Sequence, residues 1–377
     1  MCFLKSRYCL FVTLCLLCLL SCAAQEPVVN GEASYLSFQV PGALGTYPMS
    51  INDSMAVTGY YYVSSTVTRG FLRDADGAIT TFDVSGGVWT EPESINAAGD
   101  ITGFYEAVAG VPQGFLRYAD GRIITFDPPC NGVCHVAVPV GINAFEEIAG
   151  NYPFLAAGAS AGFRRSRAGD FTTIRYSQGA EYPTTVSGLN SSGTIVGSFS
   201  DFDYAVNTTS FLLHPDGFSI QFSVPLDEGY DYETTIAEGI NADGVIAGWY
   251  GVCFDSCAKK SSGGFVRSPA GEFTVFNPPG TLVTQPELGP VFSGESLSAP
   301  HRLSINQAGD ITGSYTDAKG AQHGFVRNPY GTITSFDPPK GRQTTATSIN
   351  DDGVIAGSYY YDWNARIAEG FLRVPKQ

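Results

Sequence analysis

Three residues capable of acid–base chemistry stand at one recurring place in the chain. Glu93, Glu238 and His301 each lie a few residues upstream of a segment that reads S-I-N or G-I-N. Paired carboxyl groups can cleave a glycosidic bond, one as an acid and the other as a base or nucleophile. We therefore take these three side chains as candidates for a polysaccharide hydrolase or lyase. The alternative is that they are ordinary solubility charges of an acidic protein.

No complete catalytic or metal-binding motif accompanies them. The four histidines show no H-E-x-x-H or H-x-H spacing, and no G-x-S-x-G segment occurs. The segment DADG at 74–77 lacks the ligand set of a calcium loop and matches an ordinary turn. The sequence thus predicts no defined catalytic residue, no metal and no cofactor. The formal charge of −15 also argues against a nucleic-acid partner, because phosphates require a basic surface.

Aromatic side chains gather just after a recurring glycine, and some of them are candidates for ligand binding. Half of an alternating set is expected to pack inside the fold. The remainder can stack on sugar rings or anchor a protein partner. From this group we select Tyr204, Trp249, Tyr250 and Trp363 as candidate binding residues, and we add Glu93, Glu238 and His301 to them.

Four cysteines beyond the N-terminal region form two C-x-x-x-C pairs. They are Cys130 with Cys134 and Cys253 with Cys257. In an exported protein such pairs are expected to be local disulfides that each close a short loop. The alternative is a four-cysteine zinc site, which would require two distant loops to converge.

The chain contains seven copies of one sequence repeat. In each copy an Asn is followed seven residues later by a Gly, and a G-F step follows in six of the seven. Each copy predicts four short strands, a to d: the S-I-N segment, an alternating segment, G-F-L-R, and I-T-T-F-D. Tight turns rich in Gly join a to b and c to d. The seven residues are Asn52, Asn96, Asn143, Asn190, Asn241, Asn306 and Asn350.

Four strands in roughly 44 residues is the unit of a β-propeller blade. The sequence therefore predicts an all-β fold, a seven-bladed β-propeller over residues 34–377. The last copy lacks strand d, whereas residues 34–40 precede the first copy and read as a spare one. We expect this N-terminal strand d to complete the last blade, which removes an exposed sheet edge. An open β-solenoid is the alternative.

Length variation between the copies falls only in the b–c and d–a connections. In an up-and-down blade these two connections open on the same face. Insertions gathered on one face of a repeat protein usually mark its binding face. The longest insertion spans 280–302 and is polar and rich in Pro and Gly. We call this side of the predicted propeller the variable face.

The repeat resembles the HAF repeat of bacterial extracellular proteins. The segments GINADGVIAG (239–248) and HGFVR (323–327) carry the likeness, which extends over nearly all of residues 34–373. The sequence departs from that pattern by having His before G-F only at His323, and by Gly in place of Ala. The resemblance implies an exported repeat protein and supplies no catalytic residues.

The N-terminus predicts export. Lys5 and Arg7 precede an apolar run, and Leu19-Leu20-Ser21-Cys22 resembles a bacterial lipobox. We expect residues 1–21 to be a lipoprotein signal, Cys22 to carry lipid, and residues 22–33 to be a linker. An ordinary secretory signal is the alternative. The only membrane association expected is through this anchor, at the outer membrane or cell surface.

Together these features favour an exported, monomeric, non-catalytic β-propeller. It would bind a glycan or an envelope protein on its variable face. A polysaccharide-acting hydrolase or lyase on the same scaffold is the second hypothesis, and a structural surface protein without a specific ligand is the third.

Overall fold

A computed structural model gives the fold of residues 28–30, 33–107, 111–128, 136–153, 160–176, 183–200, 207–226, 232–254, 259–281, 303–362 and 367–376. The regular structure of these residues is entirely β, in 29 strands. No helix among them is long and apolar enough to cross a membrane. The predicted all-β class is therefore confirmed.

The strands are short and follow the predicted order in each copy. The first half comprises β1 (Val28–Asn30), β2 (Ala33–Phe38), β3 (Gly45–Ile51), β4 (Val57–Ser64), β5 (Val67–Arg73), β6 (Ile79–Phe82), β7 (Gly87–Ile95), β8 (Ile101–Ala107), β9 (Pro112–Arg117), β10 (Ile123–Phe126), β11 (Val138–Ile142), β12 (Ile148–Pro153), β13 (Ser160–Arg165) and β14 (Phe171–Ile174). The second half comprises β15 (Thr184–Leu189), β16 (Ile195–Ser200), β17 (Thr208–Leu213), β18 (Ser219–Phe222), β19 (Tyr232–Ile240), β20 (Ile246–Phe254), β21 (Lys259–Arg267), β22 (Phe273–Phe276), β23 (Ser304–Ile305), β24 (Ile311–Thr316), β25 (Gln322–Arg327), β26 (Ile333–Phe336), β27 (Arg342–Ile349), β28 (Ile355–Asp362) and β29 (Ile367–Pro375).

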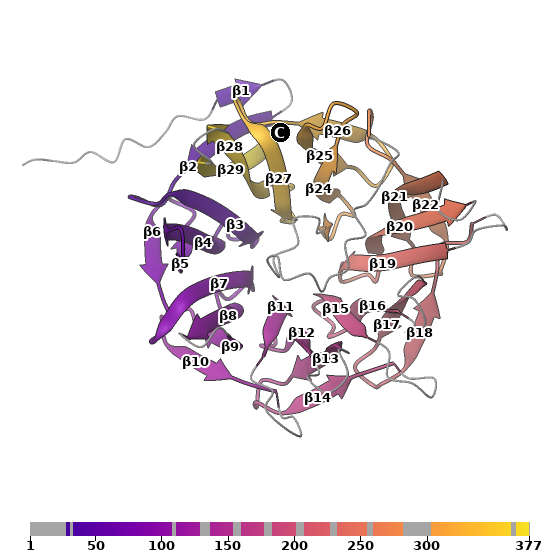
Figure 1. Cartoon of the computed structure of the whole chain (residues 1–377), viewed down its shortest axis with the longest axis horizontal. Helices are drawn as coiled ribbons and strands as arrows, with labels where there is room; N and C mark the ends of the chain where they lie inside the picture. Colours follow the sequence, from indigo (N-terminus) through magenta and orange to yellow (C-terminus); the bar gives the residue numbers. More distant parts are fainter. Residues whose placement is uncertain are drawn as a thin grey trace, which may run out of the picture.

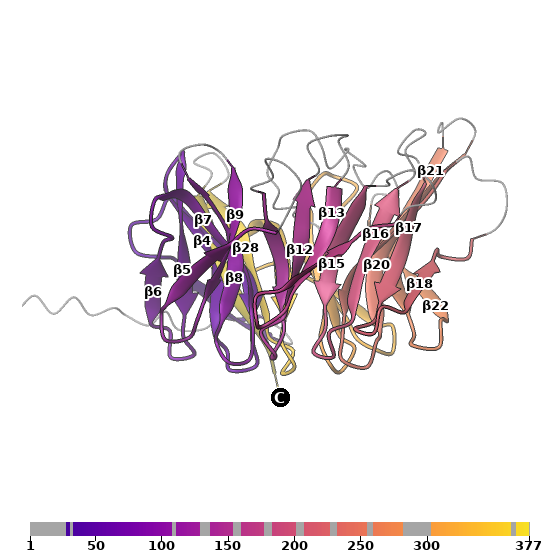
Figure 2. The same ribbon diagram turned by 90° about the horizontal axis from the view of Figure 1, so that it is seen from below.

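The strands form antiparallel sheets arranged as a ring around a central axis (Figure 1). Four sheets hold four consecutive strands each, and one holds β1, β2, β29, β28 and β27. An eight-stranded sheet consists of two such groups, β15–β18 and β19–β22, joined by a parallel bridge between Thr208 and Thr234. Seen from the side, the strands of every sheet run between the two faces of the ring (Figure 2).

Two glycine positions of the repeat are required by close packing. A Cβ on Gly103 would lie 2.1 Å from the carbonyl oxygen of Glu91, next to an irregularity in the β7–β8 ladder. A Cβ on Gly114 would lie 2.3 Å from the ring of Phe126. The Gly seven residues after each Asn and the Gly of the G-F step therefore recur because a larger side chain would clash at these positions.

The repeated Asn residues link each strand group to the next. In Asn96 the carboxamide oxygen accepts hydrogen bonds from the backbone of Ala98 and Asp100, at 3.0 and 2.9 Å, and so closes the a–b turn. Its Nδ2 donates to the backbone carbonyl of Asn143, which follows the first strand of the next sheet, at 3.1 Å. The same Nδ2 bond, at 3.0–3.4 Å, runs from Asn52 to Asn96, Asn96 to Asn143, Asn143 to Asn190, Asn190 to Asn241, Asn241 to Asn306, Asn306 to Asn350, and Asn350 back to Asn52.

A buried arginine at the end of strand c packs on the preceding strand group. Six such guanidinium groups lie 4.7–5.2 Å from the centroid of the Phe ring that ends the preceding strand d, which is cation–π geometry. Leu213 replaces the arginine in β17, and Ile174 replaces the ring in β14; both belong to one apolar cluster. The six pairs are Arg73–Phe38, Arg117–Phe82, Arg165–Phe126, Arg267–Phe222, Arg327–Phe276 and Arg373–Phe336.

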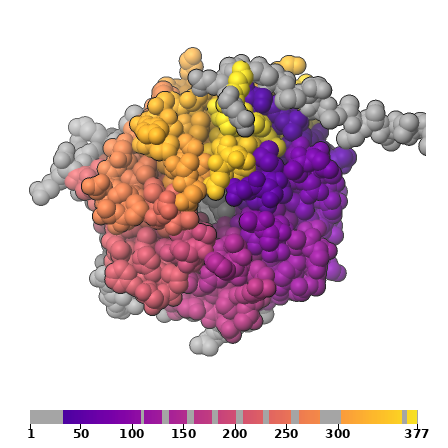
Figure 3. Space-filling view, turned by 180° about the vertical axis from the view of Figure 1, so that it is seen from behind, coloured from indigo at the N-terminus to yellow at the C-terminus, as the bar shows by residue number. Residues whose placement is uncertain are grey.

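The N-terminal strand β2 pairs antiparallel with the C-terminal strand β29. The register runs from Ala33 opposite Pro375 to Phe38 opposite Gly370. Tyr35 and Phe38 of β2 are buried in two different apolar clusters. Figure 3 shows the first described strands beside the last ones, indigo against yellow.

Candidate functional site

A pocket of about 430 Å³ opens where the β24–β25 connection meets the β26–β27 connection. In the terms of the repeat these are a b–c and a d–a connection, the two kinds whose length varies. Six of its nine lining residues have polar or charged side chains. The lining residues are Lys319, Gly320, Ala321, Gln322, His323, Asp337, Gly341, Arg342 and Gln343.

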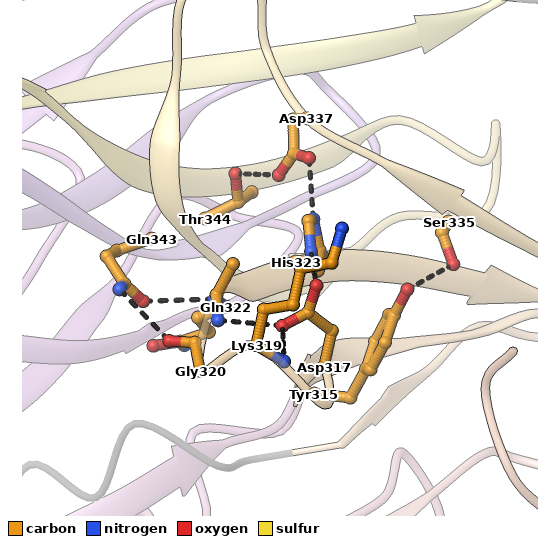
Figure 4. A network of polar contacts seen from close by, with 11 residues as sticks. Tyr315, Asp317, Lys319, Gly320, Gln322, His323, Ser335, Asp337, Gln343 and Thr344 are labelled. Atoms are coloured by element: carbon orange, nitrogen blue, oxygen red, sulfur yellow. Dashed lines mark hydrogen bonds and ion pairs between the residues drawn. The ribbon is translucent and has the colours of Figure 1, made fainter. Parts of the chain in front are cut away.

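His323 of β25 is held between two carboxylates (Figure 4). Its Nδ1 lies 2.7 Å from Oδ2 of Asp337, and its Nε2 lies 3.5 Å from Oδ2 of Asp317. The Thr344 hydroxyl donates to the other oxygen of Asp337. Asp317 is fixed in turn by the backbone N–H groups of Lys319 and Ala321, at 2.8 and 2.9 Å. The imidazole therefore has one defined orientation.

These contacts favour the imidazolium form. Partial burial alone would lower the pKa of His323, but the hydrogen bonds and charges of Asp337 and Asp317 outweigh it and raise the pKa above the ordinary 6.5. The backbone N–H of Ala321 lowers the pKa of Asp317, against a smaller opposing effect of desolvation. A histidine held in this way keeps its second proton to a higher pH than a free imidazole does, which makes it a better hydrogen-bond donor and a poorer general base.

The same pairing recurs at two other places in the repeat. Arg69 contacts Asp83 at 3.4 Å, and Gln113 donates to Asp127 at 3.0 Å. In each case a donor before the G-F step reaches the acid that follows strand d, so the pair joins strands c and d. The sequence analysis missed His323 as a site residue, and this donor–acid spacing, the same in all three copies, was the available signal.

Two glutamine side chains order the rest of the pocket wall. The backbone N–H of Gln322 donates to the side-chain oxygen of Gln343 at 3.0 Å, and Nε2 of Gln322 donates to Thr345 at 3.1 Å. The turn that carries Gln343 is strained, because Lys340 and Gln343 have φ angles of 66° and 53°. Such strain in non-glycine residues is concentrated at functional sites.

Stability should depend on the protonation of His323 between neutral and mildly alkaline pH. Because the folded pKa is raised above the unfolded value, the contribution is fully present below pH 6.5 and is lost as the pH rises through the folded pKa. We expect a decrease below about 1 kcal/mol, since the ion pairs are partly exposed. Urea unfolding measured from pH 5.5 to 8.5 checks this.

The repeat itself offers the matched variant for that measurement. His323→Gln places the amide of the Gln113–Asp127 pair next to Asp337 and removes the titrating ring. The free energy of unfolding of His323→Gln should change less with pH than that of the unchanged chain across the same pH interval. Two parallel curves would show that other groups cause the pH dependence.

None of the other predicted site residues that the structure describes lines this pocket. Trp249 is half-buried between the rings of Phe276 and Phe325, with centroids 6.5 and 6.4 Å away. Tyr250 is 9% exposed and belongs to the apolar cluster of β19–β21. Both rings thus pack inside the fold. Tyr204, Trp363 and His301 lie outside the described residues.

The two predicted acids lie on innermost strands. Oε2 of Glu238 on β19 accepts a hydrogen bond from the backbone of Leu303 at 2.6 Å, so it connects two strand groups. Glu93 on β7 is 3% exposed. Its neighbour Glu91 is 6% exposed, and burial, followed by the charges of Glu93 and Glu106, raises the pKa of Glu91 to about 8. Glu91 is therefore a buried carboxyl group with a strongly raised pKa.

Among the predicted modified cysteines, the structure describes only Cys253. This residue is buried in β20 and is disulfide-bonded. Cys22, Cys130, Cys134 and Cys257 lie outside the described residues. The two local pairings and the lipid at Cys22 therefore stay predictions.

Comparisons with known proteins support the fold. No family model matches the chain, and no curated protein matches it either, so the HAF-type resemblance stays a prediction. An oligogalacturonate lyase in complex with manganese is similar, with 11% identity, a TM-score of 0.55, and coverage of 93% of this chain and 98% of that one. An acylaminoacyl peptidase from Pyrococcus horikoshii has 10% identity and a TM-score of 0.57, with 88% of this chain and 52% of that chain covered. The chain thus spans about half the length of the peptidase. At these identities the likeness shows a β-propeller scaffold and nothing about activity.

Proposed function

We propose that the chain is an exported, non-catalytic β-propeller of seven blades that binds a glycan in the pocket beside His323. The blade count treats the two halves of the eight-stranded sheet separately and takes β2 as the strand that completes the sheet of β27–β29. The sequence of Asn-to-Asn bonds that returns to Asn52 supports this count. Export is part of the same proposal and rests on the N-terminal sequence. A monomeric state is proposed with it.

The observation that carries the glycan proposal is the position and polarity of the pocket. It lies between the two kinds of connection that vary in length, where a repeat protein usually binds its partner. Its wall presents amide, imidazole, guanidinium and ammonium groups, which suit the hydroxyl groups of a sugar. The carboxamides and the imidazole are already fixed by hydrogen bonds, so binding costs little side-chain entropy.

A glycan array probed with the purified full chain tests this proposal. We expect one or a few saccharides to bind, and Gln322→Ala and Gln343→Ala to weaken that binding at least about tenfold, because each removes an ordered polar contact. Gln113→Ala is the matched control, since it removes a half-buried amide from β9, away from the pocket. Binding that survives all pocket variants unchanged would refute the proposal.

An enzyme acting on polysaccharide is the second candidate, and Glu91 is the observation that favours it. A buried carboxyl group with a pKa of about 8 remains protonated at neutral pH and can act as a general acid. The oligogalacturonate lyase in the comparison shares the scaffold. Incubation with a panel of polysaccharides distinguishes the two hypotheses. Turnover that disappears in Glu91→Gln would support the enzyme and contradict a purely binding role.

A further inference from the structure

We propose that the ligand of the His323 pocket carries an anionic group, a carboxylate or a sulfate ester on a sugar, which Arg342 and Lys319 bind. This inference rests on the proposed glycan-binding function and specifies the class of saccharide. It follows from the charges of the pocket wall.

The pocket is basic on an acidic protein. The whole chain has 36 acidic residues against 21 Lys and Arg. The pocket lining instead contains Lys319, Arg342 and His323 against a single acid, Asp337. A local reversal of the overall charge attracts anions to one place while the rest of the surface repels them.

The acids near the pocket are already engaged, whereas the two long cations are not. Asp337 accepts from His323 and Thr344, and Asp317 accepts from His323 and two backbone N–H groups. Neither Lys319 nor Arg342 forms an ion pair with a carboxylate in the described part of the chain. The positive charge of these two side chains is therefore available to a ligand.

The turn between β26 and β27 fixes the backbone that presents Arg342. Gly341 donates to the carbonyl of Pro338 at 2.8 Å, and a Cβ on Gly341 would lie 3.0 Å from the ring of Tyr359. Lys340 and Gln343 on either side have left-handed φ angles. A guanidinium group on a fixed turn can form the paired hydrogen bonds that carboxylates and sulfates accept.

Calorimetric titration of the full chain with oligosaccharides tests the inference. The probes are galacturonic and glucuronic acid oligomers, neutral galactose and glucose oligomers of the same length, and a sulfated galactose oligomer. We expect an acidic series to bind at least about tenfold more tightly than its neutral match, and Arg342→Gln and Lys319→Gln each to remove most of that difference. Lys340→Gln is the matched control, because it removes the same charge from the same turn outside the pocket lining.

The outcomes separate the inference from the proposed function. Preference for uronates assigns a carboxylate, and preference for the sulfated oligomer assigns a sulfate ester; both support the inference. Neutral oligomers that bind as tightly as acidic ones, with sensitivity to Gln322→Ala, would overturn the inference and leave glycan binding intact. If no saccharide of any kind binds, the proposed function fails and the inference fails with it.

Discussion

Replacing Asn96 by alanine is expected to lower the free energy of unfolding by at least about 2 kcal/mol. The side chain is 4% exposed and makes four hydrogen bonds. Truncation leaves the buried N–H of Asp100 without a partner, which costs about 1–3 kcal/mol. It also removes the bond to the carbonyl of Asn143, which still accepts from the N–H of Glu146. Urea denaturation followed by tryptophan fluorescence measures the loss.

Two further variants separate the inter-sheet bond from the turn. Asn96→Asp keeps the oxygen that accepts from the turn but loses the donor to Asn143 and to the carboxylate of Asp100, which the new carboxylate would also repel. It should therefore retain only part of the stability. Asp120→Ala removes one hydrogen bond within the exposed turn after β9 and should change stability by less than about 0.5 kcal/mol. Equal effects of Asn96→Ala and Asp120→Ala would show that the Asn-to-Asn bonds add nothing.

Removing residues 1–40 should prevent stable folding of the remaining chain. The deletion takes away the six-residue β2–β29 ladder and the buried rings of Tyr35 and Phe38. Loss of a buried Phe costs about 3–5 kcal/mol, against a total stability of about 5–15 kcal/mol. It also exposes the edge of β29, which can pair with other chains. We expect loss of the cooperative thermal transition and aggregation on size-exclusion chromatography.

A synthetic peptide supplies the control for this deletion. A peptide covering residues 28–40 can add to the free edge of β29 as a strand in trans. It should restore a cooperative transition and a monomeric elution volume in a concentration-dependent way, while a peptide with Tyr35 and Phe38 replaced by Ser should not. A truncated chain that stays monomeric and as stable as the full one would refute the importance of β2.

Much of the fold could be predicted because the Asn, Gly and G-F positions recur at fixed spacing in the sequence. The alternating segment of each copy predicts a second strand, and β24 at Ile311–Thr316 is an example. The turn role of the recurring Asn was also predictable, since its side chain bonds its own backbone. Its second role was not, because the Nδ2 of Asn96 donates to Asn143, a partner that only the assembled ring brings close.

The site was less predictable, and for a related reason. Trp249 and Tyr250 are adjacent, so alternation suggested that one of them faces outward, yet both pack because two apolar clusters meet there. His323 showed no catalytic or metal-binding spacing, and its partners Asp317 and Asp337 come from different connections. The repeat spacing explains the contact with Asp337, whereas the contact with Asp317 depends on the path of one loop.

The pairing of β2 with β29 determines how this molecule would respond to mechanical tension on its two ends. Because the strands are antiparallel and Ala33 lies opposite Pro375, both ends leave the ladder at the same side. Tension would therefore separate β1 from β2 first, because Val28 lies opposite Tyr35. It would then load the Ala33–Pro375 contact and separate the six pairs of the β2–β29 ladder in succession. A molecule that is held by only one end would carry no tension between its two ends, and the β2–β29 ladder would not be loaded.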